Sequence, residues 1–520
     1  MMTSEMILPA LILIPFIGGF LCWIAERLGM GLPRWIAVIS MALVTLLGLQ
    51  LWQTGDFSLP AIGSRSPHWQ LEFVMPWLPS LGVKIHLALD GLSLLMVILT
   101  GILGVLATAC SWNEIQRHVG FFHLNLLWSL GGVIGVFLAI DMFLFFFFWE
   151  MMLVPVYFLI ALWGHQGADN KSRIYAATKF FIFTQASGLI MLIGILALVL
   201  INYHQTHVLS FDYLDLLKTQ IPAQWEMPLM LCFFVAFAVK LPIVPFHSWL
   251  PDAHAQAPTA GSVDLAGILL KTAAYGMLRF ALPLFPNASQ EFAPVAMALG
   301  LFGIFYGALL AFVQTDIKRL IAFTSVSHMG FVLIGIYAGN LMTMQGLVMQ
   351  MLAHGFSAAG LFILCGEIYE RIHTRDLREM GGMWGRFKYL PAIMMFFAAA
   401  LLGMPGTGNF VGEFLILLGS YKEYPVVSIV ATSSLVLAGV YSLIMIHRAL
   451  FGQPKDDRQL EDLSPREIAI MVSLMGILLF LGLYPQPVLD VSVGAMAQVE
   501  QAYHAVPAGI PAVISAPVMP

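Results

Sequence analysis

Long apolar segments recur along almost the whole chain and are separated by short polar stretches. Each segment reaches about 18 residues, the length that a helix needs to cross the hydrocarbon core of a bilayer. The polar–apolar alternation of membrane β-barrel strands is absent. The pattern therefore predicts an all-α membrane protein with about 14 transmembrane helices, at 7–24, 35–53, 88–110, 121–140, 142–163, 180–202, 228–246, 259–282, 294–313, 320–338, 343–366, 391–419, 425–447 and 468–486.

The polar stretches between the spans are too short for an independent domain. The two largest, 54–87 and 203–227, are expected to hold a hairpin or an amphipathic helix. The first apolar run follows Glu5 and lacks a cleavage site of small residues, so we expect a retained helix rather than a signal peptide. We divide the chain into an N-terminal three-helix segment (1–120), a first five-helix repeat (121–282), a second five-helix repeat (283–450) and a last transmembrane helix with a C-terminal tail (451–520).

A faint internal repeat relates the two central units. Residues 233–242 (FFVAFAVKLP) align without gaps to residues 396–405 (FFAAALLGMP), and Asp141 before the fifth span parallels Asp316 before the tenth. Because five spans separate the members of each pair, the two units have opposite topology, as in secondary transporters. Proline removes a backbone donor from a helix. We therefore expect two inverted five-helix repeats with broken helices near 240 and 405, at Pro242, Pro245 and Pro405.

Composition agrees with a membrane location and excludes several function classes. The chain is 59% hydrophobic and 10% charged, with a formal net charge of -5 and no basic tract, so nucleic acid is not an expected partner. Its four cysteines are far apart and form no CxxC pair, which disfavours zinc and iron–sulfur sites. We expect a multi-pass membrane protein with the lipid bilayer around it.

The basic residues predict the orientation. Seventeen of the 24 lysines and arginines lie in loops on one side of the predicted spans, and five lie in loops on the other side. Cytoplasmic loops carry the excess of Lys and Arg. We therefore expect both termini on the periplasmic side. The remaining two basic residues, Lys240 and Lys271, lie inside spans.

Charges at membrane depth are the candidate functional groups, because each costs about 2.5–3.5 kcal/mol on insertion scales. Lys240 lies at the first helix break, and Glu150 follows an aromatic run in the fifth span. Burial favours the neutral amine. A carboxylate about 4 Å away favours the ammonium by about 4 kcal/mol at an effective dielectric of 20. Because these effects are comparable and opposed, Lys240 is suited to take up and release a proton. The alternative is a fixed ion pair that locks two helices.

Further titratable groups continue toward the second unit. Lys271 lies in the eighth span, and Asp264 is seven residues earlier, on the same face of a regular helix. His328 and His354 lie in the tenth and eleventh spans, and histidine titrates near working pH. Glu413 follows the second break. We expect a proton relay of Glu150, Lys240, Lys271, His328, His354 and Glu413, with Asp264, Asp141 and Asp316 as supporting residues; membrane histidines are also common as hydrogen-bonded packing residues.

Other motifs give weaker evidence of function. His247 and His254 flank a Trp-Leu-Pro-Asp loop, but a metal site there is not favoured, and we expect no metal and no cofactor-binding site on this chain. Glycine-rich dinucleotide loops, P-loops and haem motifs are absent from the sequence. The source of energy for proton movement is therefore expected on partner subunits.

Four stretches carry a specific family resemblance: residues 145–155 (FFFFWEMMLVP), 247–263 (HSWLPDAHAQAPTAGSV), 314–330 (QTDIKRLIAFTSVSHMG) and 404–414 (MPGTGNFVGEF). They resemble the subunit M (chain 4) family of bacterial NADH:quinone oxidoreductase, respiratory complex I, an antiporter-like membrane subunit family. The resemblance runs from the first span to about residue 487.

The resemblance implies fourteen helices, two inverted units and a central hydrophilic axis that passes protons. It implies that Glu150 and Lys240 form a controlling pair, that Lys271 links to the second unit through histidines, and that Glu413 gates the exit. It also implies L-like and N-like membrane-arm neighbours, with NADH, FMN, iron–sulfur clusters and quinone on partner subunits and no redox centre here. One departure is Gly403, which occupies the place of Lys240 in the second unit.

Two other readings remain open from the sequence. The same motifs occur in subunits of multi-subunit sodium/proton antiporters and membrane-bound hydrogenases. A purely structural membrane scaffold is the third class. Retention of pumping after Lys240→Ala would favour the scaffold.

Overall fold

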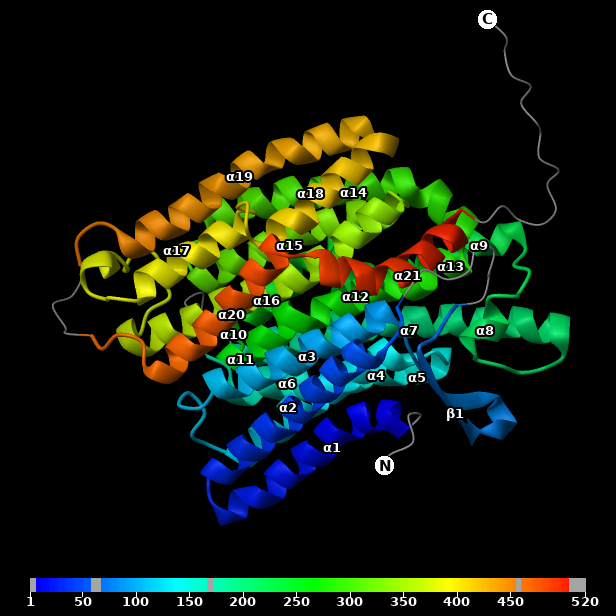
Figure 1. Cartoon of the computed structure of the whole chain (residues 1–520), viewed down its shortest axis with the longest axis horizontal. Coiled ribbons are helices and arrows are strands. Elements are labelled where there is room, and N and C mark those ends of the chain that lie inside the picture. The colour runs from blue at the N-terminus through cyan, green and yellow to red at the C-terminus, as the bar shows by residue number, and fades with distance from the viewer. Residues whose placement is uncertain (1–5, 58–66, 166–171, 455–459, 505–520) are drawn as a thin grey trace, which may run out of the picture.

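The computed structural model describes residues 6–57, 67–165, 172–454 and 460–504. Within them the chain is almost entirely helical (Figure 1), and the elements are α1 (Ile7–Ala25), α2 (Gly31–Thr54), β1 (Leu71–Leu78), β2 (Val83–Leu89), α3 (Gly91–Cys110), α4 (Val119–Leu138), α5 (Met142–Met151), α6 (Leu153–Trp163), α7 (Arg173–Thr206), α8 (Tyr213–Leu216), α9 (Ala223–Lys240), α10 (Trp249–Gln256), α11 (Thr259–Asp264), α12 (Leu270–Gly276), α13 (Leu282–Leu284), α14 (Pro286–Val313), α15 (Ile317–Tyr337), α16 (Leu341–Ile372), α17 (Leu390–Leu401), α18 (Gly408–Glu423), α19 (Pro425–Leu450), α20 (Pro465–Leu483) and α21 (Gln486–Tyr503). Short 3-10 turns lie at Glu26–Leu28, Pro79–Leu81, Phe246–Ser248 and Met383–Gly385.

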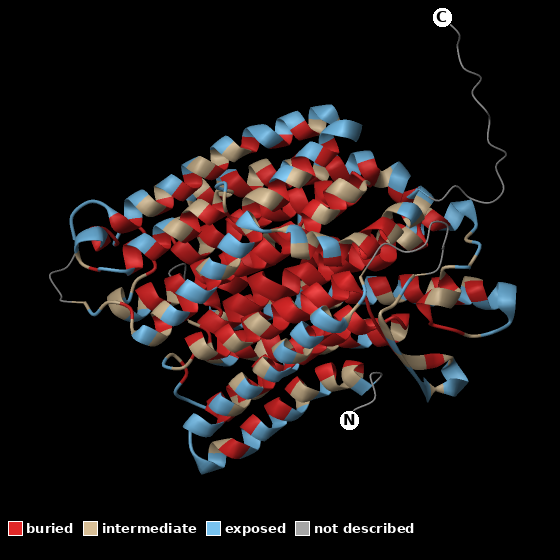
Figure 2. Cartoon of the chain, in the orientation of Figure 1, coloured by how far each residue is buried: buried red, intermediate tan, exposed pale blue. Residues whose placement is uncertain are grey.

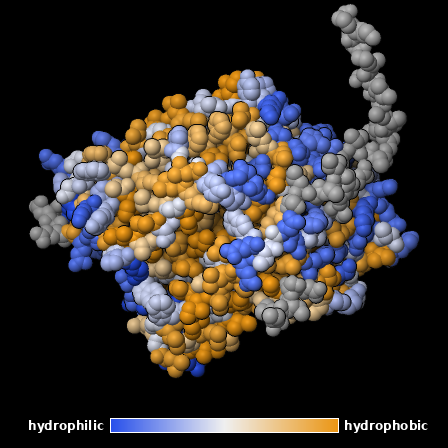
Figure 3. Space-filling view, in the orientation of Figure 1, coloured by the Kyte–Doolittle hydropathy of each residue, from blue (hydrophilic) through white to orange (hydrophobic). Residues whose placement is uncertain are grey.

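The predicted membrane spans are present. Thirteen helical segments of the described chain are long and apolar enough to cross a membrane, and the broken pair α17 and α18 supplies a fourteenth. The helices run roughly parallel across Figure 1, with α1 at one edge and α19 at the other. Hydrophobic side chains form a broad band between two more polar ends (Figure 3). This is the surface expected of a protein whose middle faces lipid.

Three spans form the centre of the bundle. The segment Thr259–Leu284, which we call helix eight, is buried along with α15 and α16. Figure 2 shows the buried residues concentrated in this middle layer. Helix eight is not a uniform α-helix, because π-helical turns at Leu265–Leu269 and Met277–Ala281 interrupt it. Such turns often occur at functional sites.

Both predicted breaks are confirmed. α9 ends at Lys240, and the chain resumes as α10 after a segment that contains Pro242 and Pro245. α17 ends at Leu401, and α18 starts at Gly408 after a segment that contains Pro405. The span predicted at 228–246 is thus interrupted after Lys240, as expected, because the prolines end the helix there.

The inverted repeat is visible in matching backbone contacts. Asp141 caps α5, and Asp316 caps α15, each through one carboxylate oxygen that accepts two backbone N–H groups. Asp141 forms an isolated bridge with Asp212, and Asp316 forms one with Asp376. The first pair lies at the end of the molecule that carries the β-hairpin, and the second lies at the opposite end. The two units therefore have the same local structure and opposite directions.

We name the two ends of the molecule after these features. The hairpin face carries β1, β2, α8 and α21, and the basic face carries the connections 26–30, 111–118, 314–316 and 373–389. The predicted hairpin in 54–87 is confirmed, since β1 and β2 pair antiparallel from Leu71 with Leu89 to Leu78 with Val83. The stretch 203–227 contains the end of α7, the four-residue helix α8 and the start of α9. α21 was not predicted; it lies across the hairpin face, where Glu500 accepts from the N–H of Leu341.

His86 joins the hairpin to the helices. Its Nδ1 lies 2.8 Å from Asp212 Oδ2, and its Nε2 lies 2.7 Å from Glu72 Oε1. Lys84 Nζ lies 3.5 Å from the same oxygen of Asp212. Burial lowers the pKa of His86, but the hydrogen bonds and charges of Asp212 and Glu72 outweigh it, so the pKa is raised above 6.5. Burial raises the pKa of Asp212, and His86 outweighs this effect and lowers it.

We expect the packing of the hairpin to weaken in alkali. The folded-state pKa of His86 is raised, so its contribution is complete below pH 6.5 and is lost as the pH passes the raised value. The contribution of Asp212 is lost only in acid, as the pH falls through its lowered pKa. Hydrogen exchange of the β2 amides, corrected for intrinsic rates, should therefore show protection that falls with rising pH. In His86→Gln this fall should disappear, and an equal fall there would refute the assignment.

Candidate functional site

The first helix break places Lys240 in the interior. Lys240 is the last residue of α9, and 1% of it is exposed. The carbonyl groups at a helix C-terminus favour a cation. Trp249 at the start of α10 donates from Nε1 to the carbonyl of Val239 at 2.8 Å, which holds the second half of the broken helix against the first. The break therefore fixes the backbone on both sides of the lysine.

The Lys240 ammonium lies over an aromatic ring. Its Nζ is 3.8 Å from the ring centroid of Trp149, a cation–π contact from the residue next to Glu150. Glu150 acts electrostatically on Lys240, and Gln185 lies near the carboxylate. Neither carboxylate oxygen of Glu150 nor Nζ of Lys240 makes a well-aligned hydrogen bond to the described residues. The two charged groups are thus neighbours without direct contact.

A glycine makes room for the Glu150 carboxylate. A Cβ built on Gly188 of α7 would lie 1.8 Å from Glu150 Oε1. Any larger residue at this position would displace the carboxylate. The close approach of α7 is therefore part of the geometry that holds Glu150 beside the break.

Helix eight directs Asp264 and Lys271 to different neighbours. Asp264 Oδ2 accepts from Ser129 Oγ of α4 at 2.6 Å, and its charge acts on Lys240. Lys271 Nζ lies 2.8 Å from His354 Nδ1 of α16, and it also donates to the carbonyl of Ala266. The spacing of seven residues had predicted that Asp264 and Lys271 lie on the same face of the helix. The π turn at Leu265–Leu269 lies between them and changes the rotation per residue, which a sequence pattern does not show.

Buried polar groups continue from Lys271 to the second break. The rings of His354 and His328 lie 5.5 Å apart between their centroids. His328 Nδ1 lies 2.9 Å from Glu413 Oε1, and Gln350 Nε2 donates to the same oxygen at 3.1 Å. Nε2 of each histidine has no hydrogen-bond partner among the described residues. We call Lys271, His354, His328 and Glu413 the central row; none of them is more than 4% exposed.

The second break explains why Gly403 replaces a lysine. Gly403 has φ +77°, a left-handed conformation that L-residues rarely adopt. A Cβ on it would lie 2.7 Å from Glu413 Oε2. The Glu413 carboxylate thus occupies the space into which a side chain at 403 would project. Both breaks interrupt a helix at a proline-containing segment, one beside a lysine and the other beside a glutamate.

The remaining sequence candidates lie outside the central row. Asp141 and Asp316 lie at opposite faces as helix caps. His247 packs on Tyr306, and His254 stacks on Phe362 with centroids 4.3 Å apart. Within the described ranges, one group of three metal-ligating side chains is close enough to hold an ion, and it comprises Glu367, Glu370 and Glu467 rather than these histidines.

Sequence reasoning missed several members of the site. Trp149 was not among the predicted site residues, although it adjoins Glu150 in the aromatic run. Gln350 is four residues before His354 and therefore on the same helical face, so the sequence spacing could have identified it. The opening made by Gly188 depends on how α7 approaches α5, and no sequence pattern reports that distance.

Comparisons with known proteins identify the family and the fold. A profile of the family "NADH:quinone oxidoreductase/Mrp antiporter, TM" matches residues 139–438. The chain is 68% identical over 497 residues to NADH-quinone oxidoreductase subunit M of Pseudomonas aeruginosa, covering 95% of this chain and 98% of the relative. A chain of respiratory complex I from Thermus thermophilus superimposes with a TM-score of 0.83 at 29% identity, covering 96% of this chain and 99% of that one.

A chain of the Mrp complex from a Dietzia species has the same fold. Its TM-score is 0.81 at 20% identity, with 96% of this chain and 100% of that chain covered. This likeness concerns the fold alone. On the profile match and the high identity along nearly its whole length, this chain belongs to the NADH:quinone oxidoreductase/Mrp antiporter family, in the branch of the NADH-quinone oxidoreductase M subunits.

Proposed function

We propose that this chain moves protons across the membrane through Glu150, Lys240 and the central row, driven by electron transfer in other subunits of an NADH:quinone oxidoreductase. The observation that supports this most is the contact series Lys271–His354, His354–His328 and His328–Glu413 in the buried centre. A run of neighbouring titratable groups is costly at membrane depth and is typical of proton pathways. A scaffold needs no such run.

The chemistry of each step follows from the contacts. Lys271 donates to His354 Nδ1, and the ring releases a proton from Nε2 when Nδ1 takes one up. His328 hands a proton to the Glu413 carboxylate, which its Nδ1 already contacts. Between Lys240 and Lys271 the polar atoms of Lys240 and Asp264 lack complete protein hydrogen bonding. Buried polar atoms of this kind are normally bonded by water, so we expect water to carry this step.

The partners and orientation belong to the same proposal. Relatives of this chain are named as subunits of NADH-quinone oxidoreductase, so we expect L-like and N-like neighbours, with NADH, FMN, iron–sulfur clusters and quinone held elsewhere. Under the positive-inside rule the basic face is cytoplasmic and the hairpin face is periplasmic. The units 121–282 and 283–450 would then take up and release protons from opposite sides. The 68% identity to subunit M favours this role over that of a sodium/proton antiporter subunit.

Substitutions of Glu413 test directly whether the proposed proton exit needs a carboxyl group. We expect Glu413→Ala to lower NADH-driven proton pumping by about tenfold or more, whereas Glu413→Asp keeps a carboxyl and should retain about half of the rate. Pumping is measured with a pH-sensitive dye in membrane vesicles, at matched content of assembled complex. Equal losses in the two variants would mean that packing volume matters and the carboxyl does not.

A further inference from the structure

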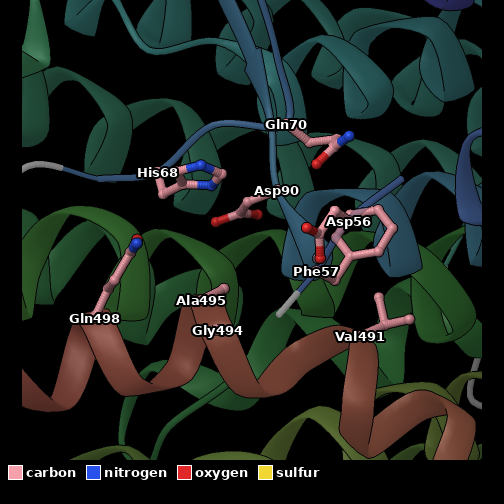
Figure 4. A pocket seen from close by; sticks show the side chains of 10 residues that line it. Asp56, Phe57, His68, Gln70, Asp90, Val491, Gly494, Ala495 and Gln498 are labelled. Atoms are coloured by element: carbon pink, nitrogen blue, oxygen red, sulfur yellow. The ribbon is translucent and has the colours of Figure 1, made fainter. Parts of the chain in front are cut away.

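A water-accessible pocket on the hairpin face reaches toward helix eight (Figure 4). It is small, with about 20 Å³ of space for water, enough for about one molecule, and α21 forms one wall with Val491, Gly494 and Ala495. The side chains of His68 and Asp90 point into it. Because His68 is exposed and Asp90 is only 4% exposed, the pocket leads from the surface to a buried carboxylate.

Asp90 is held from behind by an arginine. Its Oδ1 accepts from the N–H of Ser93 at 2.9 Å as the cap of α3, and its Oδ2 forms an ion pair with Arg279. Arg279 is 3% exposed and belongs to the second π turn of helix eight. Its guanidinium lies 5.0 Å from the ring centroid of Trp69 and 5.5 Å from that of Tyr275. The arginine therefore cannot move away from the base of the pocket without breaking several contacts.

Polar groups lead from this arginine part of the way toward the central row. Tyr275 Oη donates to the carbonyl of Phe137 at 2.9 Å and lies 3.2 Å from Ser93 Oγ. Tyr275 follows Lys271 by four residues within α12, one helical turn along the same face. A proton that passed from the pocket through Asp90 to this hydroxyl would be one helical turn from Lys271. Tyr275 and Lys271 share no hydrogen bond in the described part of the chain, so water would have to carry the last step. Such a path would return protons from the hairpin face and dissipate the gradient.

Arg279 carries the one charge in this path that opposes such a return. A guanidinium keeps its proton in proteins, so its charge is fixed. A fixed cation in a narrow polar passage excludes protons, as in water-selective channels. It also occupies Oδ2 of Asp90, while the N–H of Ser93 occupies Oδ1.

We propose that Arg279, positioned by Asp90, is the electrostatic barrier that prevents protons on the hairpin face from returning to Lys271. This rests on the proposed function, because the barrier matters only if Lys271 carries protons. The buried ion pair, which lies outside the relay, would then control the direction of proton movement in addition to stabilising the fold.

The test measures proton leak in the absence of NADH. Vesicles that contain the assembled complex are given an imposed pH gradient, acid on the hairpin face, with the membrane potential clamped by potassium and valinomycin. We expect Arg279→Gln to speed the decay of the gradient by about tenfold over the wild type, after subtraction of vesicles that lack the chain. Arg279→Lys, which keeps a cation, should remain tight.

The matched control separates a barrier from a structural ion pair. Asp90→Asn breaks the pair, keeps the helix cap and leaves the arginine charged, so its vesicles should remain tight. A merely structural role predicts equal leaks in Asp90→Asn and Arg279→Gln. The double variant Asp90→Asn/Arg279→Gln leaves no unpaired buried charge, and it should leak even if Arg279→Gln alone does not assemble.

A second-site variant tests the route. Lys271→Met combined with Arg279→Gln should remove the leak, and a leak of equal size in this double variant would overturn the proposal, as would tight Arg279→Gln vesicles. The proposed function fails separately, if Lys271→Met alone pumps normally with NADH. If Lys271→Met loses pumping while Arg279→Gln vesicles stay tight, the barrier proposal is refuted and the relay proposal stands.

Discussion

Vesicles that carry Lys240→Ala should oxidise NADH with an assembled complex and pump protons at about one tenth of the wild-type rate or less. Lys240 lies at the break between α9 and α10, with its ammonium over Trp149 and within the field of Glu150. Burial favours the neutral amine and Glu150 favours the ammonium. Because these influences oppose each other, a small movement of the carboxylate switches the preferred state. Alanine removes the amine that ends α9.

Two variants check that the loss arises from this charge pair. Glu150→Ala should reduce pumping in the same way, since the carboxylate is the group that sets the state of Lys240. Lys422→Ala provides the matched control, because Lys422 is an exposed lysine near the end of α18. Pumping is followed with a pH-sensitive dye. Wild-type pumping in both Lys240→Ala and Glu150→Ala would defeat the account.

Lys271→Met should also block pumping, by about tenfold or more, while Glu150 and Lys240 remain intact. Lys271 Nζ contacts His354 Nδ1, and it is the first member of the central row. Without the amine, a proton from the first unit has no partner at the start of that row. Methionine has a similar shape and is tolerated in packed interiors.

Lys271→Arg distinguishes a relay from a fixed charge. Arginine keeps the positive charge and does not release its proton, so a relay predicts loss of pumping in this variant as well. A purely electrostatic or packing role of Lys271 predicts that arginine substitutes for it. Nearly full pumping in Lys271→Arg would therefore remove Lys271 from the pathway.

Most of the fold was predictable because a membrane imposes strong rules on a sequence. The apolar runs predicted the transmembrane spans, and the prolines at 242, 245 and 405 predicted the two helix breaks. The ends of the helices were less accurate; α7 extends over Arg173–Thr206, well beyond the predicted 180–202. α21 was missed because it lies along the surface and shows no long apolar run.

The candidate site was predictable in its residues and less so in its contacts. Charges and histidines within apolar runs stand out, and this pattern located every member of the central row. The direction of Asp264 did not follow, because a π turn changes the phase of helix eight. The pairing of Asp90 with Arg279 joins residues far apart in the chain, and only the fold brings them together.

The break at Gly403 shows how the two units diverged in chemistry. The faint repeat predicted equivalent positions at Lys240 and Gly403, and it left the absence of a second lysine unexplained. In the structure Glu413 enters the space beside Gly403 and contacts His328. The first unit thus ends its broken helix with a cation, and the second places a carboxylate at the corresponding break.

A structure of the whole complex with resolved water molecules tests the central claim most directly. The account predicts ordered water that joins Lys240 to Lys271 and fills the gap between Glu150 and Lys240. Dry apolar packing between these three side chains, at a resolution that shows water elsewhere in the bundle, would contradict it.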